Sequence, residues 1–177
     1  MTTRSPDLNE TESIFASREV AERWHRAKAH RAKITGGASE LMLEMANIRA
    51  ADRVLDVAAG TGDQTILAAQ RVGPTGSVLA VDLSPSMLKI ADEAARNAGL
   101  TNVEMRVMNA EKIDFDTDSF DAVICRMGLM VFSNPVKALM GMRRVVKPGR
   151  KVVALVPSTA EKNPCRSIPL AVVRRVR

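Results

Sequence analysis

The sequence predicts an α/β fold with a doubly wound, mainly parallel sheet and helices ahead of it. Three observations support this prediction. Five short apolar segments recur from residue 53 onward, and segments with helical spacing lie between them. Glycine or proline marks most of the boundaries. Strands that alternate with helices of this length form βαβ units, and such units build a parallel sheet.

The five predicted strands differ in how their apolar residues are arranged. Segments 53–58, 77–82 and 151–156 are short and apolar, and segment 103–108 alternates between apolar and polar residues. Segment 120–127, FDAVICRM, is almost continuously apolar, which is typical of a strand covered on both faces.

Capping residues delimit the helices between these strands. Segment 63–72 has helical spacing and stops at Gly73-Pro74. Ser84 is a good N-cap for the next helix because its hydroxyl can accept a free backbone N–H, and Gly99 can end that helix in a left-handed conformation. Asn134 repeats the cap ahead of Pro135, and this helix is expected to end at the KPG of residues 147–149.

Ahead of residue 53 the sequence predicts two helices, roughly 10–33 and 39–47, separated by a break at Gly36-Gly37. The predicted organisation is therefore an N-terminal helical segment, 1–50, a sheet-containing domain, 51–157, and a C-terminal segment, 158–177. Aromatic residues make up only 3% of the chain, so methionine must fill part of the core. We expect the methionine-rich runs 127–130 and 139–142 to be core residues.

The positive charge is concentrated near the C-terminus. The net charge is +6, and residues 101–177 carry fourteen Lys/Arg against seven Asp/Glu. The two basic stretches there, MRRVVKPGRK and VVRRVR, contain no interleaved aromatic residues that could stack on bases. A solvated helix surface is therefore favoured, and no nucleic-acid partner is expected.

The chain carries no recognisable targeting signal. No apolar run is long enough to span a membrane, and the first residues contain three acids and no apolar h-region. Cys125 and Cys165 do not form a disulfide framework in this context and are expected to be ordinary thiols. The predicted location is cytoplasmic.

The stretch VLDVAAGTGDQT, residues 54–65, indicates a ligand site. It joins the first strand to the first helix, and ligands of open parallel sheets lie beyond such carboxyl ends of strands. Ala58, Gly60 and Gly62 leave little side-chain bulk where a ligand approaches the backbone. The next strand ends in Asp82, whose carboxylate can accept hydrogen bonds from the two hydroxyls of a ribose. The expected ligand contains a nucleoside.

Charge favours one class of nucleoside cofactor. A dinucleotide loop reads G-x-G-x-x-G, but here Thr65 stands in the third glycine position and Asp63 would lie near a pyrophosphate. Asp56 adds a second negative charge. These carboxylates suit a cationic cofactor such as S-adenosyl-L-methionine, whereas a nicotinamide-dependent oxidoreductase remains the alternative.

Four segments together resemble the class I S-adenosylmethionine-dependent methyltransferases, and most closely the ubiquinone/menaquinone-biosynthesis C-methyltransferase family (methyltransferase domain type 11-like). They are VLDVAAGTGDQT, VLAVDLSPSMLKIA, NAEKIDFDTDSFDAVICRMGL and ALMGMRRVVKPGRKVVAL, within residues 53–156. The resemblance implies a Rossmann-like domain and S-adenosyl-L-methionine as the cofactor.

The resemblance also assigns roles to individual residues. In the methionine part of the cofactor's site it places Asp56, Ala58, Gly60, Thr61 and Gly62. It places Asp82 at the ribose, and near the adenine it places Leu83, Met87, Asn109 and Ala110. Arg126 would lie close to the methyl donor, where an arginine is unexpected because its charge faces the sulfonium unless it turns away or meets the cofactor's carboxylate. Ala58 and Arg150 stand where the family commonly has glycine.

Simpler interpretations stand beside these assignments. Asp56 and Asp82 could serve only as helix-capping acids, and the glycines could serve only a tight turn. Asn109 could be a turn residue, and Arg126 could be a surface or salt-bridging residue. His25 and His30 are expected on the solvated surface of an N-terminal helix. The sequence contains no metal-ligand cluster, and it identifies no catalytic base.

The resemblance implies methyl transfer to a small acceptor, quinone-like or lipid-like, and a lipid-like acceptor would add peripheral membrane contact. Phe15 and Trp24 are expected to cover the acceptor pocket or to pack in the core. Class I enzymes have further strands after the fifth, so the sequence predicts a truncated continuation after residue 157. The alternative function is accordingly a weak or inactive cofactor-binding or interaction module. An uncovered fifth strand would favour a homodimer through the sheet edge.

Overall fold

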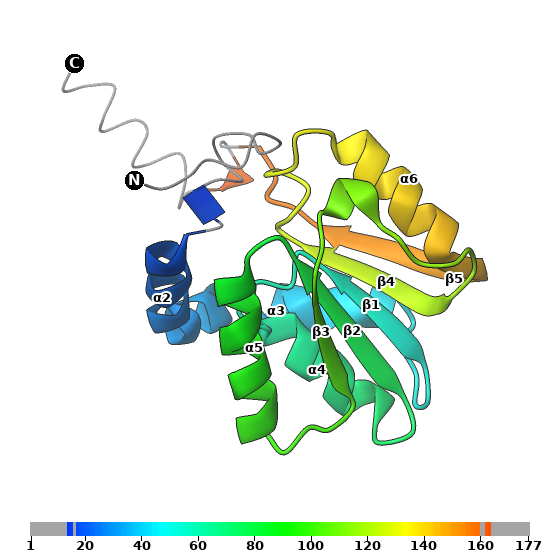
Figure 1. Ribbon diagram of the computed structural model, residues 1–177, viewed down its shortest axis with the longest axis horizontal. Coiled ribbons are helices and arrows are strands. Elements are labelled where there is room, and N and C mark those ends of the chain that lie inside the picture. The colour runs from blue at the N-terminus through cyan, green and yellow to red at the C-terminus, as the bar shows by residue number, and fades with distance from the viewer. Residues whose placement is uncertain (1–13, 16, 160–161, 164–177) are drawn as a thin grey trace.

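A computed structural model of the chain describes residues 14–15, 17–159 and 162–163. Its centre is a five-stranded sheet, parallel throughout, in the order β3-β2-β1-β4-β5 (Figure 1). The strands are β1 (Arg53–Val57), β2 (Ser77–Asp82), β3 (Val103–Val107), β4 (Phe120–Arg126) and β5 (Val146–Leu155). The predicted doubly wound fold is confirmed. Its switch point lies between β1 and β4, where ligands of such sheets bind.

The helices between the strands begin where their caps predict. These helices are α4 (Asp63–Val72), α5 (Pro85–Asn97), the short 3₁₀ helix η1 (Ala110–Lys112) and α6 (Pro135–Val145). The Ser84 hydroxyl accepts the backbone N–H of Met87, and Asn134 Oδ1 accepts that of Lys137. Gly99 follows α5 with φ of 71°, the left-handed conformation expected of it.

The N-terminal helices differ from the prediction. Helix α2 (Arg18–Arg26) and helix α3 (Lys28–Met45) meet at Ala27, and α3 runs without a break through Gly36 and Gly37. The expected break at these glycines is therefore wrong. Each glycine weakens a helix by about 1 kcal/mol, but Met42 and Leu43 of α3 are buried in the core, and this packing outweighs the local preference. The predicted start near residue 10 lies outside the described residues.

Strand β5 starts earlier than predicted. It follows α6 directly at Val146, and it includes the KPG expected to separate them. Its pairing with β4 shifts register between Phe120 and Ala122, and Gly149 has φ of 75° there. Arg150, where the family commonly has glycine, forms ion pairs with Asp52 and with Asp121, the latter at 3.4 Å. These contacts occupy the end of the sheet opposite the glycine loop.

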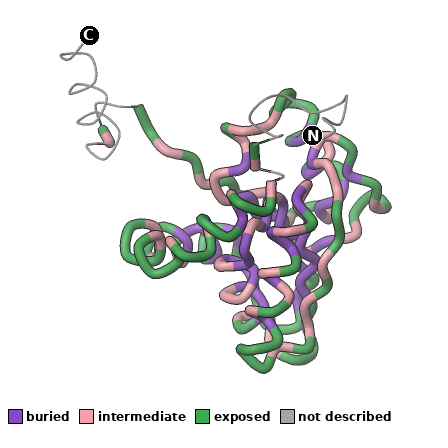
Figure 2. Tube along the Cα trace, turned by 60° about the vertical axis from the view of Figure 1, so that its left-hand side comes forward, coloured by how far each residue is buried: buried purple, intermediate pink, exposed green. Residues whose placement is uncertain are grey.

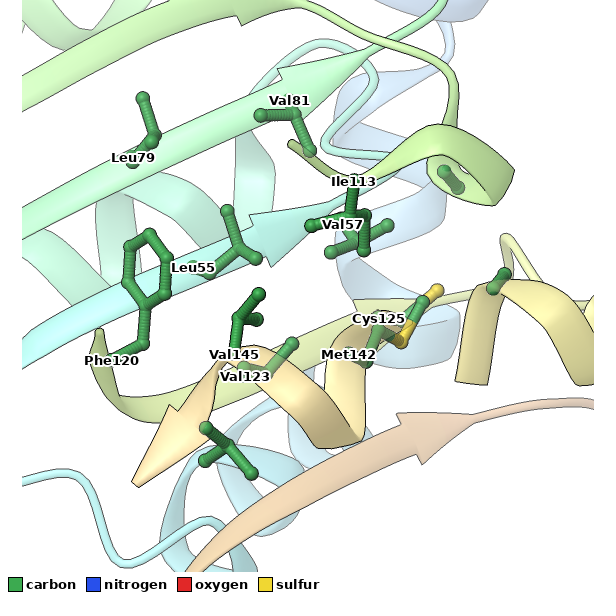
Figure 3. Packing of buried hydrophobic residues seen from close by; sticks show 13 residues of the cluster. Leu55, Val57, Leu79, Val81, Ile113, Phe120, Val123, Cys125, Met142 and Val145 are labelled. Carbon is green, nitrogen blue, oxygen red and sulfur yellow. The ribbon is translucent and has the colours of Figure 1, made fainter. Parts of the chain in front are cut away.

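Both faces of the sheet are covered. One face packs on α6 and η1 through the cluster in Figure 3, which contains Leu55, Val123 and Met142. The other face packs on α3 and α4 through residues that include Leu43, Val54, Ala69 and Ile124. In the tube of Figure 2 the buried segments run through the centre of the molecule, as expected for a sheet covered on both sides.

The methionine prediction is only partly right. Met142 is fully buried, but Met130 and Met140 are exposed to 54% and 68%, together with Leu139 of the same helix α6. Leu139 and Met140 lie on the outer face of α6, because Ala138, Met142 and Val145 form its inner face, whereas Met130 lies ahead of this helix. No helix among the described residues is long and apolar enough to cross a membrane. β5 is an edge strand of the described sheet, and dimerisation through it stays a prediction.

Candidate functional site

The loop after β1 turns through three left-handed residues. Ala58 and Gly60 both have φ of 58°, and Gly62 has φ of 82°. A Cβ on Gly62 would lie only 2.8 Å from the Ala91 Cβ of α5, so glycine is needed here both for conformation and for space. Ala58, which stands where glycine is common, adopts the glycine-like conformation nevertheless. The bare backbone turn predicted from the sequence is therefore present.

Asp82 at the end of β2 holds this loop in place. Its Oδ2 accepts the backbone N–H of Gly60 at 2.9 Å, and its Oδ1 accepts that of Ser84 at 2.8 Å. Burial raises the pKa of this carboxyl, although the N–H groups of Ser84, Gly60 and Leu83 oppose the rise. The carboxylate thus joins the ends of β1 and β2, and its bond to Ser84 lies at the start of α5. Each oxygen retains a lone pair for a further donor.

Asp56 lies deeper than the prediction placed it. Its side chain is fully buried, Thr65 Oγ1 donates to Oδ2 at 2.5 Å, and Gln64 Nε2 donates to Oδ1 at 3.0 Å. Burial raises the pKa of Asp56 to about 6, against the lowering effect of these two bonds and of Arg126. The carboxylate therefore braces the first turn of α4 from behind the loop. A role of Asp56 at the methionine part of a cofactor stays a prediction.

The residues expected near an adenine gather beside Asp82. The backbone N–H of Met108 donates to the Asp82 carbonyl at 2.9 Å, which brings the end of β3 to this edge. Asn109 then caps η1, since its Oδ1 accepts the N–H of Glu111 at 2.8 Å, and this is the turn role left open above. Ala110 and Met87 are buried, whereas Leu83 is partly exposed.

Arg126, the last residue of β4, turns toward the N-terminal helices. Its Nη2 lies 3.2 Å from Asp63 Oδ2, and its Nη1 donates to Ser39 Oγ of α3 at 3.1 Å. The salt-bridging interpretation of Arg126 is therefore confirmed. The charge expected to face the sulfonium is instead neutralised by the carboxylate of Asp63.

A residue that the sequence interpretation missed completes this cluster. Arg31 of α3 donates through Nη2 to Asp63 Oδ2 at 2.9 Å and to Thr61 Oγ1 at 3.1 Å. It is one of eight basic residues in the first fifty. Its partners lie about thirty positions away in the chain, so no local pattern distinguishes it from its neighbours.

Trp24 covers the same loop from α2. The Arg31 guanidinium lies 4.7 Å from the centre of the Trp24 ring and donates to the Trp24 carbonyl. A Cβ on Gly60 would lie 3.9 Å from the indole nitrogen, so the indole approaches the bare backbone. Phe15 meets Trp24 edge to face at 5.9 Å. The N-terminal helices therefore cover the glycine loop, and their role at an acceptor pocket stays a prediction.

Other polar features of the described residues lie away from the glycine loop. Two surface hollows of about 440 and 460 Å³ lie elsewhere, one between α2 and α5 and one between α5 and β3. His25 and His30 are exposed, as expected. Within the described part of the chain, no group of three or more His, Cys, Asp or Glu could hold a metal ion.

Comparison with known proteins decides the family. The model of the ubiE/COQ5 methyltransferase family matches residues 34–168, which is more than half of the chain. The chain belongs to the ubiE/COQ5 methyltransferase family. The resemblance inferred from the four sequence segments is thereby confirmed.

Individual members and structures agree with this assignment. The Ubiquinone/menaquinone biosynthesis C-methyltransferase UbiE of Pseudomonas fluorescens (strain Pf0-1) is 40% identical over 114 residues, 64% of this chain and 44% of that protein. The crystal structure of a SAM dependent methyltransferase from Aquifex aeolicus is 28% identical with a TM-score of 0.61, covering 66% of this chain and 62% of that one. These names agree with the predicted cofactor.

A third comparison concerns the fold alone. A crystal structure from Methanococcus maripaludis matches with a TM-score of 0.72 and 19% identity, covering 94% of this chain and 74% of that one. The chain spans about half the length of the curated ubiE/COQ5 relatives that it matches, 44% of the Pseudomonas fluorescens protein and 58% of one from Pseudomonas putida.

Proposed function

We propose that this chain binds S-adenosyl-L-methionine at the carboxyl ends of β1 and β2 and transfers its methyl group to a small acceptor. The observation that carries the proposal is the hydrogen bond from the Gly60 N–H to Asp82, which fixes a bare loop beside a carboxylate at the carboxyl ends of the parallel strands. Membership of the ubiE/COQ5 methyltransferase family supports the same function.

The residues present fit this cofactor. Asp82 retains acceptor capacity for ribose hydroxyls, and Leu83 is exposed enough to contact an adenine beside it. Asp63 Oδ1 is a buried oxygen without a partner, which suits a cationic ligand group at the loop. When bound, S-adenosyl-L-methionine supplies an activated methyl group on a sulfonium, with a thioether as leaving group.

The chain's own contribution is positioning. The left-handed turn at Gly60 and Gly62 leaves room for a ligand at the backbone, and Trp24 of α2 lies beside it. If the acceptor atom is a ring carbon, transfer of this methyl group would also release a ring proton, so a base would be needed. The names of the relatives support a quinone-like ring as the acceptor.

A second candidate function is cofactor binding without catalytic turnover. One observation favours it: the described histidines, His25 and His30, are both exposed, and the buried Asp56 has both oxygens occupied by protein donors. None of these three groups is placed to accept a proton from an acceptor at the loop.

The two candidates are distinguished by product formation. The chain would be incubated with S-adenosyl-L-methionine and a short-chain benzoquinol or naphthoquinol lacking a ring methyl. Active methyl transfer yields equal amounts of S-adenosylhomocysteine and methylated quinol, both measured by mass spectrometry, and omission of the quinol gives the background. A chain that binds the cofactor but forms neither product is the binding module.

A further inference from the structure

Trp24 of α2 and Arg31 of α3 both contact the glycine loop. The indole nitrogen lies 3.9 Å from the position that a Cβ on Gly60 would take, so the indole rests against the bare backbone. Arg31 Nη2 donates to Thr61 Oγ1 at 3.1 Å and to Asp63 Oδ2 at 2.9 Å. The chain's own side chains therefore lie where the left-handed turn leaves the backbone bare.

Arg31 also binds α2. Its guanidinium lies 4.7 Å from the centre of the Trp24 ring, and Nη1 donates to the Trp24 carbonyl. A cation over an indole and a charge-assisted hydrogen bond are both stronger than the corresponding neutral contacts. Because one guanidinium contacts both α2 and the loop, it fastens this helix to the loop.

The rest of α2 makes little contact with the core. Of its nine residues, all of which the structure describes, Ala21 is the one that is buried. The helix lies at the outside of the molecule beside α5 (Figure 1), and the hollow of about 440 Å³ between them is lined by Glu22 and His25 on one side and by Ile90 and Glu93 on the other. An element with so little buried apolar surface can open while the sheet stays folded.

Ala27 is placed to act as the hinge of such a movement. It joins the end of α2 to the start of α3, and its ψ of 4° lies outside the range of a regular α-helix. Helix α3 is anchored further along, because Met42 and Leu43 are buried and Ser39 Oγ accepts from Arg126 at 3.1 Å. Helix α2 can therefore turn about Ala27 while α3 stays in place.

The closed contact leaves two polar atoms unsatisfied. Asp63 Oδ1 and Arg31 Nε are buried and have no hydrogen-bond partner. Most buried polar atoms in proteins are paired, and an unpaired one destabilises the state that contains it. Opening exposes both atoms to water, which offsets part of the loss of the closed contact.

We propose that α2 is a self-occluding lid, fastened by Arg31 and Trp24, which must turn away from the loop before a ligand reaches the Gly60 backbone. The closed position then competes with the ligand, and the apparent affinity is the intrinsic affinity multiplied by the open fraction. This inference rests on the proposed function, since it concerns access to the same loop. It predicts that a weaker fastening strengthens ligand binding.

The variant Arg31→Gln tests the fastening. Glutamine can neither pair with Asp63 as an ion nor place a cation over Trp24, whereas Arg126 still neutralises Asp63 at 3.2 Å. S-adenosylhomocysteine would be titrated calorimetrically into the wild type and the variant. Arg31→Gln is expected to bind it about 10-fold more tightly, because the loss of charge-assisted contacts shifts the equilibrium toward the open position.

Arg71→Gln serves as the matched control. Arg71 is also a helical arginine that joins two elements, because it pairs with Glu40 of α3 at 2.9 Å. Its pair links α4 to α3, however, and not α2 to the loop. This variant should keep the wild-type affinity, and thermal unfolding shows whether both variants remain folded.

Trp24 reports the position of α2 directly, since it is the one tryptophan of the chain. Quenching of its fluorescence by acrylamide measures how accessible the indole is. Without ligand, quenching should be stronger in Arg31→Gln than in the wild type, and saturating S-adenosylhomocysteine should strengthen quenching in the wild type. Weaker quenching on ligand binding would mean that α2 closes over the ligand, and this would overturn the proposed competition.

The outcomes separate the lid from the proposed function. Equal or weaker binding by a folded Arg31→Gln chain overturns the lid, although the proposed function stands because the ligand still binds. Binding by Arg31→Gln but not by the wild type supports both. If neither chain binds, the proposed function fails, and equal quenching of the two unliganded chains would then overturn the fastening as well.

Discussion

The carboxylate of Asp82 accepts a hydrogen bond from the backbone N–H of Gly60 at 2.9 Å, so the end of β2 fixes the loop that follows β1. The two residues are twenty-two positions apart, and the parallel pairing of β1 with β2 brings them together. Capping and ligand binding were alternative roles for Asp82. The cap of α5 is Ser84, whose own N–H the Asp82 carboxylate accepts, so Asp82 supports the capping residue and keeps lone pairs for a ligand.

Replacement of Gly62 by alanine is expected to destabilise the fold. Its φ of 82° disfavours any side chain by about 1–2 kcal/mol, and the new Cβ would lie 2.8 Å from the Ala91 Cβ. Together with this overlap, the free energy of unfolding should fall by about 2–4 kcal/mol. Urea denaturation followed by circular dichroism measures the change.

Replacement of Gly36 by alanine is expected to stabilise the fold. Gly36 lies inside α3, and no atom within 4 Å would meet its Cβ. This variant should gain about 0.5–1 kcal/mol of stability, because alanine is the better helix former. A loss of stability in Gly36→Ala would show that α3 does not run through the glycine pair in solution.

The ionisation of Asp56 should make the free energy of unfolding depend on pH. Burial raises its pKa from 3.8 to about 6, so the folded chain holds a proton between about pH 4 and 6 that the unfolded chain has lost. The free energy of unfolding therefore decreases as the pH rises through this window. The contribution of this one group is on the order of 3 kcal/mol.

Asp56→Asn isolates this effect. The amide cannot ionise, and it can accept from Gln64 and donate to the Thr65 hydroxyl, so the local hydrogen bonds can be kept. Denaturation at pH 4, 5, 6 and 7 should show the difference between wild type and variant changing across the window, in favour of the variant at pH 7. A constant difference would mean that Asp56 ionises normally in the folded chain.

Cys125 should be unreactive while the chain is folded. Its side chain is fully buried, and burial together with the Asp56 carboxylate raises the pKa of the thiol to about 12. Thiolates are the reactive species, so labelling by an aromatic disulfide at pH 8 should be about 10³-fold slower than in the unfolded chain.

The labelling is measured in Cys165→Ser, because Cys165 lies outside the described residues. Absorbance then reports Cys125 alone. Rapid labelling without denaturant would place the thiol on an accessible surface and contradict the packing of β4 against α6.

Much of the sheet could be predicted because its signals are local. Ser84 and Asn134 are caps followed by proline, and both helices begin where these residues indicate. The N-terminal helices were misjudged because the Gly36-Gly37 pair is a local signal for a break. Burial of Leu43 against α4 and the sheet outweighs it, and such packing is not visible in a short window.

The candidate site also combines features that are local in the sequence with features that depend on tertiary contacts. The bare loop and Asp82 were predictable because the ends of strands and the spacing of glycines can be recognised within short stretches of the sequence. The depth of Asp56 depends on where Gln64 and Thr65 of α4 point, and the role of Arg31 depends on the docking of α3 against the loop. These are tertiary contacts, so one sequence could not distinguish a ligand-facing carboxylate from a buried one.

The central claim is that the loop after β1 and the carboxylate of Asp82 bind an adenosyl cofactor. Calorimetric titration with S-adenosyl-L-methionine tests it most directly in the wild type, in Asp82→Ala and in the control Asp92→Ala, an acid of α5 paired with Arg96. The wild type and the control should bind equally, and Asp82→Ala at least about 10-fold more weakly. Wild-type affinity in a folded Asp82→Ala chain, or no binding by the wild type, would contradict the claim.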